Sequence, residues 1–114
     1  MSDNCLFCKI AAKRIPAKLL YEDDELFAFA DIGPQAPTHI LLCPRKHLAS
    51  LAEATPEDQA LLGKMQLVAA ELARKEKLSS GYRTVINTGT GAGQSVLHLH
   101  LHLLGGRDFS WPPG

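Results

Sequence analysis

Apolar residues recur every three or four positions along one stretch of the chain, which predicts a long amphipathic helix. Thr55 can cap its start, Pro56 suits its first turn, and two acidic residues follow near the positive end of the helix dipole. We expect the helix to run to about Lys77 and to end before Gly81. Its apolar face is expected to pack on the core, and part of that face could also serve a dimer contact. The positions on that face are Leu61, Leu62, Met65, Val68, Ala69 and Leu72.

Shorter apolar runs between turn residues predict five strands. The expected strands cover residues 18–22, 25–31, 38–43, 82–88 and 97–104. In the second of them, Phe27, Phe29 and Asp31 point to one face, because successive side chains of a strand alternate. A short helix over residues 5–12 precedes the strands. Together these elements predict an α+β domain, with a mainly antiparallel five-stranded sheet, one long helix and one short N-terminal helix.

The chain has 114 residues, which fits a single domain spanning residues 1–114. Its 12 Lys and Arg residues balance 12 Asp and Glu residues, so the composition argues against a surface for nucleic acid or membranes. The first residues, Met1 to Cys5, lack a basic start followed by an apolar run, which argues against a secretory signal. Three cysteines, an odd number, fit a reducing compartment better than a disulfide framework. We therefore expect a cytoplasmic protein.

Three histidines alternate with leucines near the end of the chain. In a strand, this alternation places the leucines on one face and His98, His100 and His102 on the other. Residues on the same face lie roughly 6.7 Å apart, so the outer pair is about 13 Å apart. A single metal ion, whose bonds to nitrogen are about 2.0–2.1 Å long, is not expected to gather all three while the strand stays straight. The three histidines are therefore expected to have different roles.

A glycine-rich segment, residues 87–95, comes directly before the histidines. Glycines let the backbone approach an anion, and Asn87, Gln94 and Ser95 add polar side chains. The segment lacks the Gly-Lys-Ser/Thr of a Walker loop, and alone it is more often an ordinary turn. Next to a row of histidines, however, it predicts a phosphate cradle. Since histidine is a competent nucleophile near neutral pH, the two features together indicate chemistry at a phosphorus centre.

The sequence His98-Leu99-His100-Leu101-His102-Leu103-Leu104 resembles the motif of the histidine-triad family, His-x-His-x-His followed by two apolar residues. Residues 31–39, 93–96, 104–107 and 111–114 resemble the histidine-triad nucleotide-binding branch of that family, so the resemblance covers nearly the whole chain. It implies a histidine-triad fold, a homodimer and hydrolysis of purine nucleoside 5′-phosphoramidates, including adenylylated amines. A covalent nucleotidyl-histidine is the implied intermediate. The third histidine, where related nucleotidyltransferases have Gln, favours water as the final acceptor.

The resemblance also assigns roles to individual residues. His100 is the expected nucleophile, Asp31 is expected to bind the ribose hydroxyls, and Trp111 is expected to reach the partner subunit's site. The catalytic group consists of His100, His39, His98, His102 and Ser95, the last of which helps to protonate the leaving amine. The base pocket consists of Phe7, Ile10, Phe29, Ile32 and Leu41. The phosphate site consists of Asn87, Gly93, Gln94, Ser95, His100 and His102.

Cys5 and Cys8 have the spacing of two zinc ligands, although buried thiols without a metal are an equal alternative at this spacing. The resemblance adds His47 and His98, because some family members bind zinc with such a cysteine pair and two histidines. A Cys₂His₂ set of this kind would be closed and structural, and no cofactor is expected for catalysis. Cys43 is expected to lie in the core.

Three other functions stay open at the level of the sequence. They are a dinucleoside polyphosphate hydrolase, a regulatory nucleotide-binding protein with little turnover, and a zinc module without catalysis. The polyphosphate hydrolases share the triad but usually lack the Trp-Pro-Pro-Gly ending of residues 111–114. The phosphate loop argues against a pure zinc module.

Overall fold

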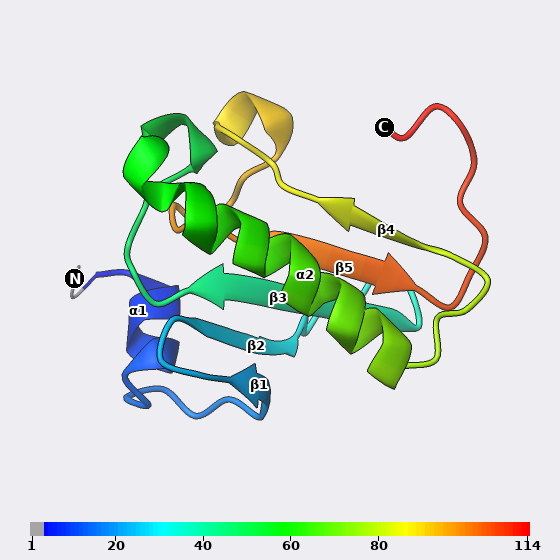
Figure 1. The fold of residues 1–114 in the computed structure, drawn as a ribbon, viewed down its shortest axis with the longest axis horizontal. Helices are drawn as coiled ribbons and strands as arrows, with labels where there is room; N and C mark the ends of the chain where they lie inside the picture. Colours follow the sequence, from blue (N-terminus) through cyan, green and yellow to red (C-terminus); the bar gives the residue numbers. More distant parts are fainter. Residues whose placement is uncertain (1–3) are drawn as a thin grey trace.

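Five strands form one antiparallel sheet in the order β1-β2-β3-β5-β4, and a long helix crosses one face of it (Figure 1). The computed structural model describes residues 4–114; Met1, Ser2 and Asp3, on which the expected absence of a secretory signal partly rests, lie outside the described residues. The strands are β1 (Leu19–Glu22), β2 (Leu26–Ala30), β3 (Thr38–Pro44), β4 (Tyr82–Val85) and β5 (Leu101–Gly105). The helices are α1 (Leu6–Ala11) and α2 (Gln59–Lys75), and 3₁₀ turns cover Leu51–Glu53, Pro56–Asp58 and Thr90–Ala92. The predicted α+β fold is confirmed.

The long helix begins after a capped 3₁₀ turn rather than as one continuous helix from Pro56. Asp58 Oδ2 accepts a hydrogen bond from the Thr55 backbone N–H at 2.9 Å, and Lys46 Nζ lies 2.6 Å from Asp58 Oδ1. At the other end, Lys77 adopts a φ of 59°, a left-handed conformation that cannot continue a right-handed helix. The sequence therefore located this helix to within a turn at each end.

The fifth strand is shorter than predicted. β5 begins at Leu101, so residues 97–100 lie outside the sheet. The neighbouring strand β3 ends at Pro44, which has no N–H to donate to a ladder, and its pairing with β5 stops at the Leu42–Leu101 pair. The prediction of one straight strand over residues 97–104 is therefore wrong in its first half.

This difference changes the setting of the triad. Only His102 lies in a strand, while His98 and His100 lie in the segment that leads into it. In that segment the Leu99 N–H donates to the Leu48 carbonyl at 2.7 Å, in the loop that follows β3. The predicted leucine face also loses one member, because Leu97 is 56% exposed.

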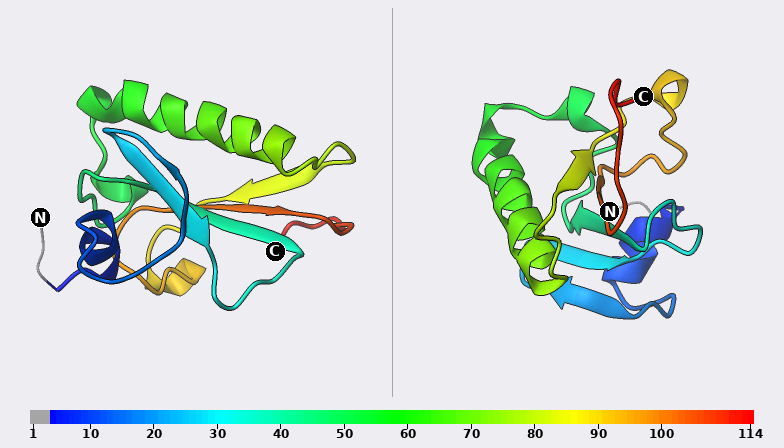
Figure 2. Two further views of the ribbon diagram at one scale, coloured as in Figure 1. Left: turned by 90° about the horizontal axis from the view of Figure 1, so that it is seen from below. Right: turned by 90° about the vertical axis from the view of Figure 1, so that its right-hand side faces the viewer.

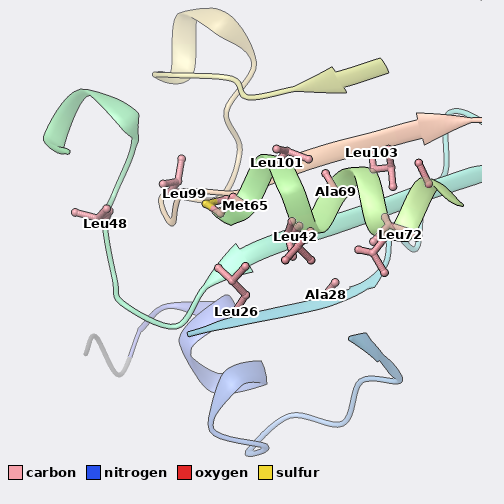
Figure 3. Close-up of a cluster of buried hydrophobic side chains, with 13 residues drawn as sticks. Leu26, Ala28, Leu42, Leu48, Met65, Ala69, Leu72, Leu99, Leu101 and Leu103 are labelled. Atoms are coloured by element: carbon pink, nitrogen blue, oxygen red, sulfur yellow. The ribbon is translucent and has the colours of Figure 1, made fainter. Parts of the chain in front are cut away.

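The two faces of the sheet bury different sets of side chains, as the alternation in β2 predicted. Leu26 and Ala28 pack with α2 in the main core, whereas Phe27 and Phe29 face the other way. Figure 3 shows the main core between the sheet and α2. Its buried members are Leu26, Ala28, Ile40, Leu42, Leu48, Met65, Val68, Ala69, Leu72, Ala73, Leu99, Leu101 and Leu103.

The opposite face of the sheet carries α1 and the 3₁₀ turn at Thr90–Ala92 (Figure 2). A second apolar cluster fills the space under α1, and the cluster contains Cys43 as expected. Its buried members are Cys5, Phe7, Cys8, Ile10, Ala11, Phe27, Phe29, Leu41 and Cys43. Among the described residues, no helix combines the length and apolar character that crossing a membrane requires.

Candidate active site

A pocket of 660 Å³ lies on the face of the sheet that carries α1. Most of its wall is apolar, and the side chains of His100, His102, Ser95 and Asp31 interrupt this wall with polar groups. A concave apolar site with a few polar groups is typical of small-molecule binding. The predicted site residues that line it are Phe7, Ile10, Phe29, Asp31, Ile32, Leu41, Ser95, His100 and His102.

Part of the pocket wall was not predicted from the sequence. The chain between α1 and β1 contributes Ile15, Pro16, Ala17 and Lys18. The remaining lining residues are Leu6, Ala30 and Val96. The segment between α1 and β1 has no periodic pattern, so its place beside the pocket follows only from how the chain returns to the sheet.

His100 has its ring held in one tautomer by its own backbone neighbour. Its Nδ1 lies 2.7 Å from the carbonyl oxygen of His98, and because a carbonyl can only accept, Nδ1 carries the proton. Nε2 of the neutral ring therefore keeps a lone pair. The Phe7 ring packs edge-on against the imidazole, with ring centroids 5.0 Å apart. A buried imidazole with an unprotonated nitrogen at a pocket wall is equipped to act as a nucleophile.

His102 is held in the opposite tautomer by a chain of hydrogen bonds. The Gln35 backbone N–H donates to His39 Nδ1 at 3.0 Å, so the proton of neutral His39 lies on Nε2. His39 Nε2–H then donates to His102 Nδ1 at 2.9 Å, which leaves the proton of His102 on its own Nε2. Asp31 Oδ2 lies 3.5 Å from His39 Nε2 and completes the cluster. The arrangement makes His102 Nε2 a hydrogen-bond donor, on a ring whose centroid lies 5.0 Å from that of His100.

The same three side chains, Asp31, His39 and His102, bring ligand-type atoms within 4.8 Å of one another. A metal at this point would need lone pairs on both facing ring nitrogens. The Gln35 N–H occupies the other nitrogen of His39, so a neutral His39 keeps a proton on the facing one. The hydrogen-bond pattern therefore favours a proton, rather than a metal ion, between the two histidines.

His102 is neutral well below neutral pH. Burial disfavours its imidazolium, and His100 and His39 repel the same charge, so its pKa falls to about 4 against the attraction of Asp31. The unfolded chain takes up this proton near the ordinary value of 6.5, whereas the folded chain resists it until about pH 4. This contribution to stability is therefore complete above pH 6.5 and is lost as the pH falls toward 4.

We expect the free energy of unfolding to fall by roughly 2 kcal/mol between pH 7 and pH 4.5 because of His102. Urea denaturation at several pH values measures the slope of the free energy of unfolding against pH. His102→Gln should reduce this slope because glutamine does not titrate. The slope should not vanish, since burial also lowers the pKa of His98. Equal slopes in the two proteins would contradict the assigned environment of His102.

The first histidine of the triad belongs to a different cluster, with Cys5, Cys8 and His47. His98 Nδ1 lies 3.3 Å from Cys5 Sγ, 3.5 Å from Cys8 Sγ and 3.1 Å from His47 Nδ1. His47 Nδ1 lies 3.3 Å from Cys8 Sγ. On the far side of the His98 ring, Nε2–H donates to the Pro44 carbonyl at 2.8 Å, which leaves the Nδ1 lone pair directed at the sulfurs.

The dimensions of this Cys–His cluster, defined as Cys5, Cys8, His47 and His98, suit a tetrahedral metal ion. Bonds of about 2.3 Å to sulfur and 2.0–2.1 Å to nitrogen give tetrahedron edges of roughly 3.3–3.8 Å. Four of the separations between these donor atoms are 3.1–3.5 Å, close to such edges, and all four ligand atoms lie within 4.8 Å of one another. The expectation that the three triad histidines have different roles agrees with these separate surroundings.

The glycine-rich loop is braced by Gln94. Its Oε1 accepts from the Gly89 N–H at 2.8 Å, and its Nε2 donates to the carbonyls of Ala49 and Val96 at 2.7 and 3.0 Å. Gly93, directly before it, has a φ of 94° that favours glycine and closes the 3₁₀ turn. Asn87, Gly93 and Gln94 do not line the pocket, so their expected contact with phosphate stays a prediction.

Gln94→Ala is expected to lower the free energy of unfolding by about 2 kcal/mol, because it leaves three backbone groups around a buried site without their partner. Urea denaturation measures the change. Gln66→Ala is the matched control, since Gln66 is exposed on α2, where alanine is a good helix former. Equal effects of the two substitutions would contradict the bracing role.

Trp111 is 85% exposed and does not line the pocket of its own chain. The tail that carries it is held by Arg83, whose Nη2 donates to the Ser110 carbonyl at 2.9 Å. Arg83 and Arg107 both contact the Phe109 ring, at 4.9 and 4.2 Å from its centroid. The predicted contact of Trp111 with a partner subunit is not tested by a single chain and stays a prediction.

The chain is similar to known proteins over most of its length. A family model of the HIT domain matches residues 12–109. An uncharacterized HIT-like protein of Synechococcus elongatus is 55% identical over 114 residues, which cover 100% of both chains. Protein HitA of Neisseria gonorrhoeae is 57% identical over 103 residues, which cover 90% of this chain and 96% of HitA.

Solved structures show the same fold. The crystal structure of a HIT family hydrolase from Legionella pneumophila has a TM-score of 0.95 and 53% identity, and the match covers 97% of this chain and 100% of that one. A histidine triad protein from Clostridium difficile has a TM-score of 0.93 and 37% identity, with 96% of each chain covered.

Proposed function

The chain belongs to the HIT family, and from that premise we propose that it hydrolyses purine nucleoside 5′-phosphoramidates, including adenylylated amines. The observation that carries the proposal is the pair of complementary tautomers at the pocket: a lone pair on His100 Nε2 and a proton on His102 Nε2, on two rings whose centroids lie 5.0 Å apart. The similarity to a protein described as a HIT family hydrolase supports the hydrolase class.

The proposed reaction consists of two displacements at the α-phosphorus. In the first, His100 Nε2 forms a bond to phosphorus as the bond to the amine breaks, and Ser95, which lines the pocket, gives its proton to the leaving amine. In the second, water attacks phosphorus, its proton passes to the Ser95 oxygen that lost one in the first step, and the bond to His100 breaks, which releases the nucleoside monophosphate and restores both side chains. His102 donates from Nε2 to a non-bridging oxygen and stabilises the charge that develops there.

The proposed position of the nucleotide follows the pocket wall. The base lies against the apolar side chains of Phe7, Ile10, Phe29 and Leu41, with Ile32 at the exposed rim. Asp31 is proposed to bind the ribose hydroxyls with its carboxylate. One of its oxygens accepts from the Gly33 N–H at 2.8 Å, which fixes the orientation of the carboxylate at the pocket wall.

A quenched reaction tests the function directly. The protein is mixed with an adenosine 5′-phosphoramidate, stopped within the first moments, and examined by intact mass. We expect an adenylyl adduct on His100 together with released AMP. Neither adduct nor AMP would overturn the proposal, and turnover of a diadenosine polyphosphate in the same protein would then point to a polyphosphate hydrolase.

We further propose that the Cys–His cluster holds one structural zinc ion. The donor set of two thiols and two imidazole nitrogens and their near-tetrahedral separations support this. Zinc would supply a cross-link among α1, the loop after β3 and the triad segment, and no step of the reaction passes through it. Metal analysis of protein purified without a histidine tag should give one zinc per chain, and metal-free protein would contradict the proposal.

We also propose a homodimer in which Trp111 reaches the partner subunit's pocket. The exposure of Trp111 and its absence from the lining of its own chain's pocket support this. Light scattering should give twice the mass of one chain, and a monomer at working concentration would overturn it.

A further inference from the structure

The short helix α1 belongs to two sites at once. Cys5 caps it and Cys8 lies within it, and both sulfurs face the Cys–His cluster. Between and after these cysteines, Leu6, Phe7 and Ile10 line the pocket. One short helix and its cap therefore carry ligand atoms for the cluster and apolar side chains for the pocket wall.

His98 connects the same two sites along a second route. Its ring belongs to the Cys–His cluster, while its carbonyl oxygen accepts the hydrogen bond that sets the tautomer of His100. The side chain is fully buried, so the ring has little freedom to move without moving its backbone. The Phe7 ring contacts both histidines, with centroids 5.9 Å from His98 and 5.0 Å from His100.

We infer that metal binding at the Cys–His cluster and nucleotide binding in the pocket are thermodynamically coupled through α1 and His98. A helix of six residues has little stability of its own, so its order depends on tertiary anchors. Metal ligation by Cys5 and Cys8 supplies such an anchor, and with it the wall formed by Phe7 is already in place when the nucleotide arrives. Without metal, nucleotide binding must itself order that wall, which costs affinity.

The coupling is reciprocal: if zinc raises the affinity for the nucleotide by some factor, the nucleotide must raise the affinity for zinc by the same factor. This inference rests on the proposed zinc and nucleotide sites, but it adds a property that neither site has alone. The Cys–His cluster then helps to position the pocket wall and His100, in addition to cross-linking the fold.

Calorimetric titration of the whole protein tests the coupling. AMP is titrated into zinc-loaded and zinc-stripped protein, and the zinc affinity is measured with and without AMP. We expect AMP to bind about tenfold more weakly without zinc, and zinc to bind more weakly without AMP by the same factor. Cobalt(II) in place of zinc gives a second readout, since the visible absorption bands of the bound ion should shift when AMP is added.

Variants separate the coupling from the two sites. Cys8→Ser should lose zinc and show the weak AMP affinity of stripped protein, whereas Cys43→Ala should behave as the unchanged chain, because Cys43 is a buried cysteine outside the cluster. Phe7→Leu should keep both ligands but reduce the factor that links them.

Each outcome has a distinct meaning. Equal AMP affinities with and without zinc, together with an unshifted cobalt spectrum, would overturn the coupling and leave both sites standing. If the protein binds no zinc, both the coupling and the proposed zinc site are overturned, and the hydrolase proposal remains. No AMP binding in either form would overturn it together with the proposed function.

Discussion

Replacing His100 by alanine is expected to lower turnover of an adenosine 5′-phosphoramidate by at least about a thousandfold, because losing a covalent nucleophile costs several orders of magnitude in comparable enzymes. The structure gives the reason: the His98 carbonyl fixes the proton of His100 on Nδ1, and the remaining lone pair is the one that attacks. Within residues 4–114 the neighbouring triad histidine at the pocket, His102, offers no equivalent replacement, since it carries its proton on Nε2. Steady-state release of AMP and intact mass of the quenched mixture measure the loss.

The variant should keep its fold, because His100 lies outside the main core, and its affinity for AMP, because the apolar pocket wall that is proposed to hold the base is unchanged. Thermal unfolding and calorimetry with AMP provide these controls. Retention of more than about a tenth of the activity, with the fold intact, would exclude His100 as the nucleophile.

Local patterns predicted those parts of the fold that depend on neighbours along the chain. The two-residue period of β2 correctly assigned Phe27 to one face and Leu26 to the other, and the helical period located the apolar face of α2. The start of β5 was predicted wrongly because it depends on Pro44 in β3. Pro44 has no N–H for the ladder, so the β3–β5 pairing reaches only Leu101, three residues after His98.

The sequence predicted several of the side chains that line the pocket, but not the hydrogen bonds that set their protonation. The row of histidines and the Cys-x-x-Cys pair indicated candidate site residues, and the resemblance to a family added His39 and His47. The tautomers, by contrast, depend on the Gln35 N–H and the His98 carbonyl, which are backbone groups that every sequence contains. Backbone partners leave no sequence signal, so the complementary states of His100 and His102 emerge only from the folded chain.

His39→Leu is expected to lower kcat by about 10–100-fold, with the KM for the nucleotide changed by less than about threefold. His39 is a positioning residue, because it acts on His102 and does not line the pocket. Leucine removes the Nε2–H donor, and His102 can then place its proton on Nδ1. Its Nε2 would present a lone pair to the negatively charged phosphate, so the stabilisation of the transition state is lost while the apolar binding wall is unchanged.

His39→Gln is the matched control, because the glutamine amide nitrogen can reach a position close to the imidazole Nε2 and donate to His102 as His39 does. It should recover at least part of the lost kcat, although it cannot accept from the Gln35 N–H with the same geometry. A purely structural role for His39 predicts instead that both variants lose stability and activity in parallel. Full activity in His39→Leu would show that His102 needs no partner to hold its proton, and the hydrogen-bond chain from Gln35 would then have no part in the reaction.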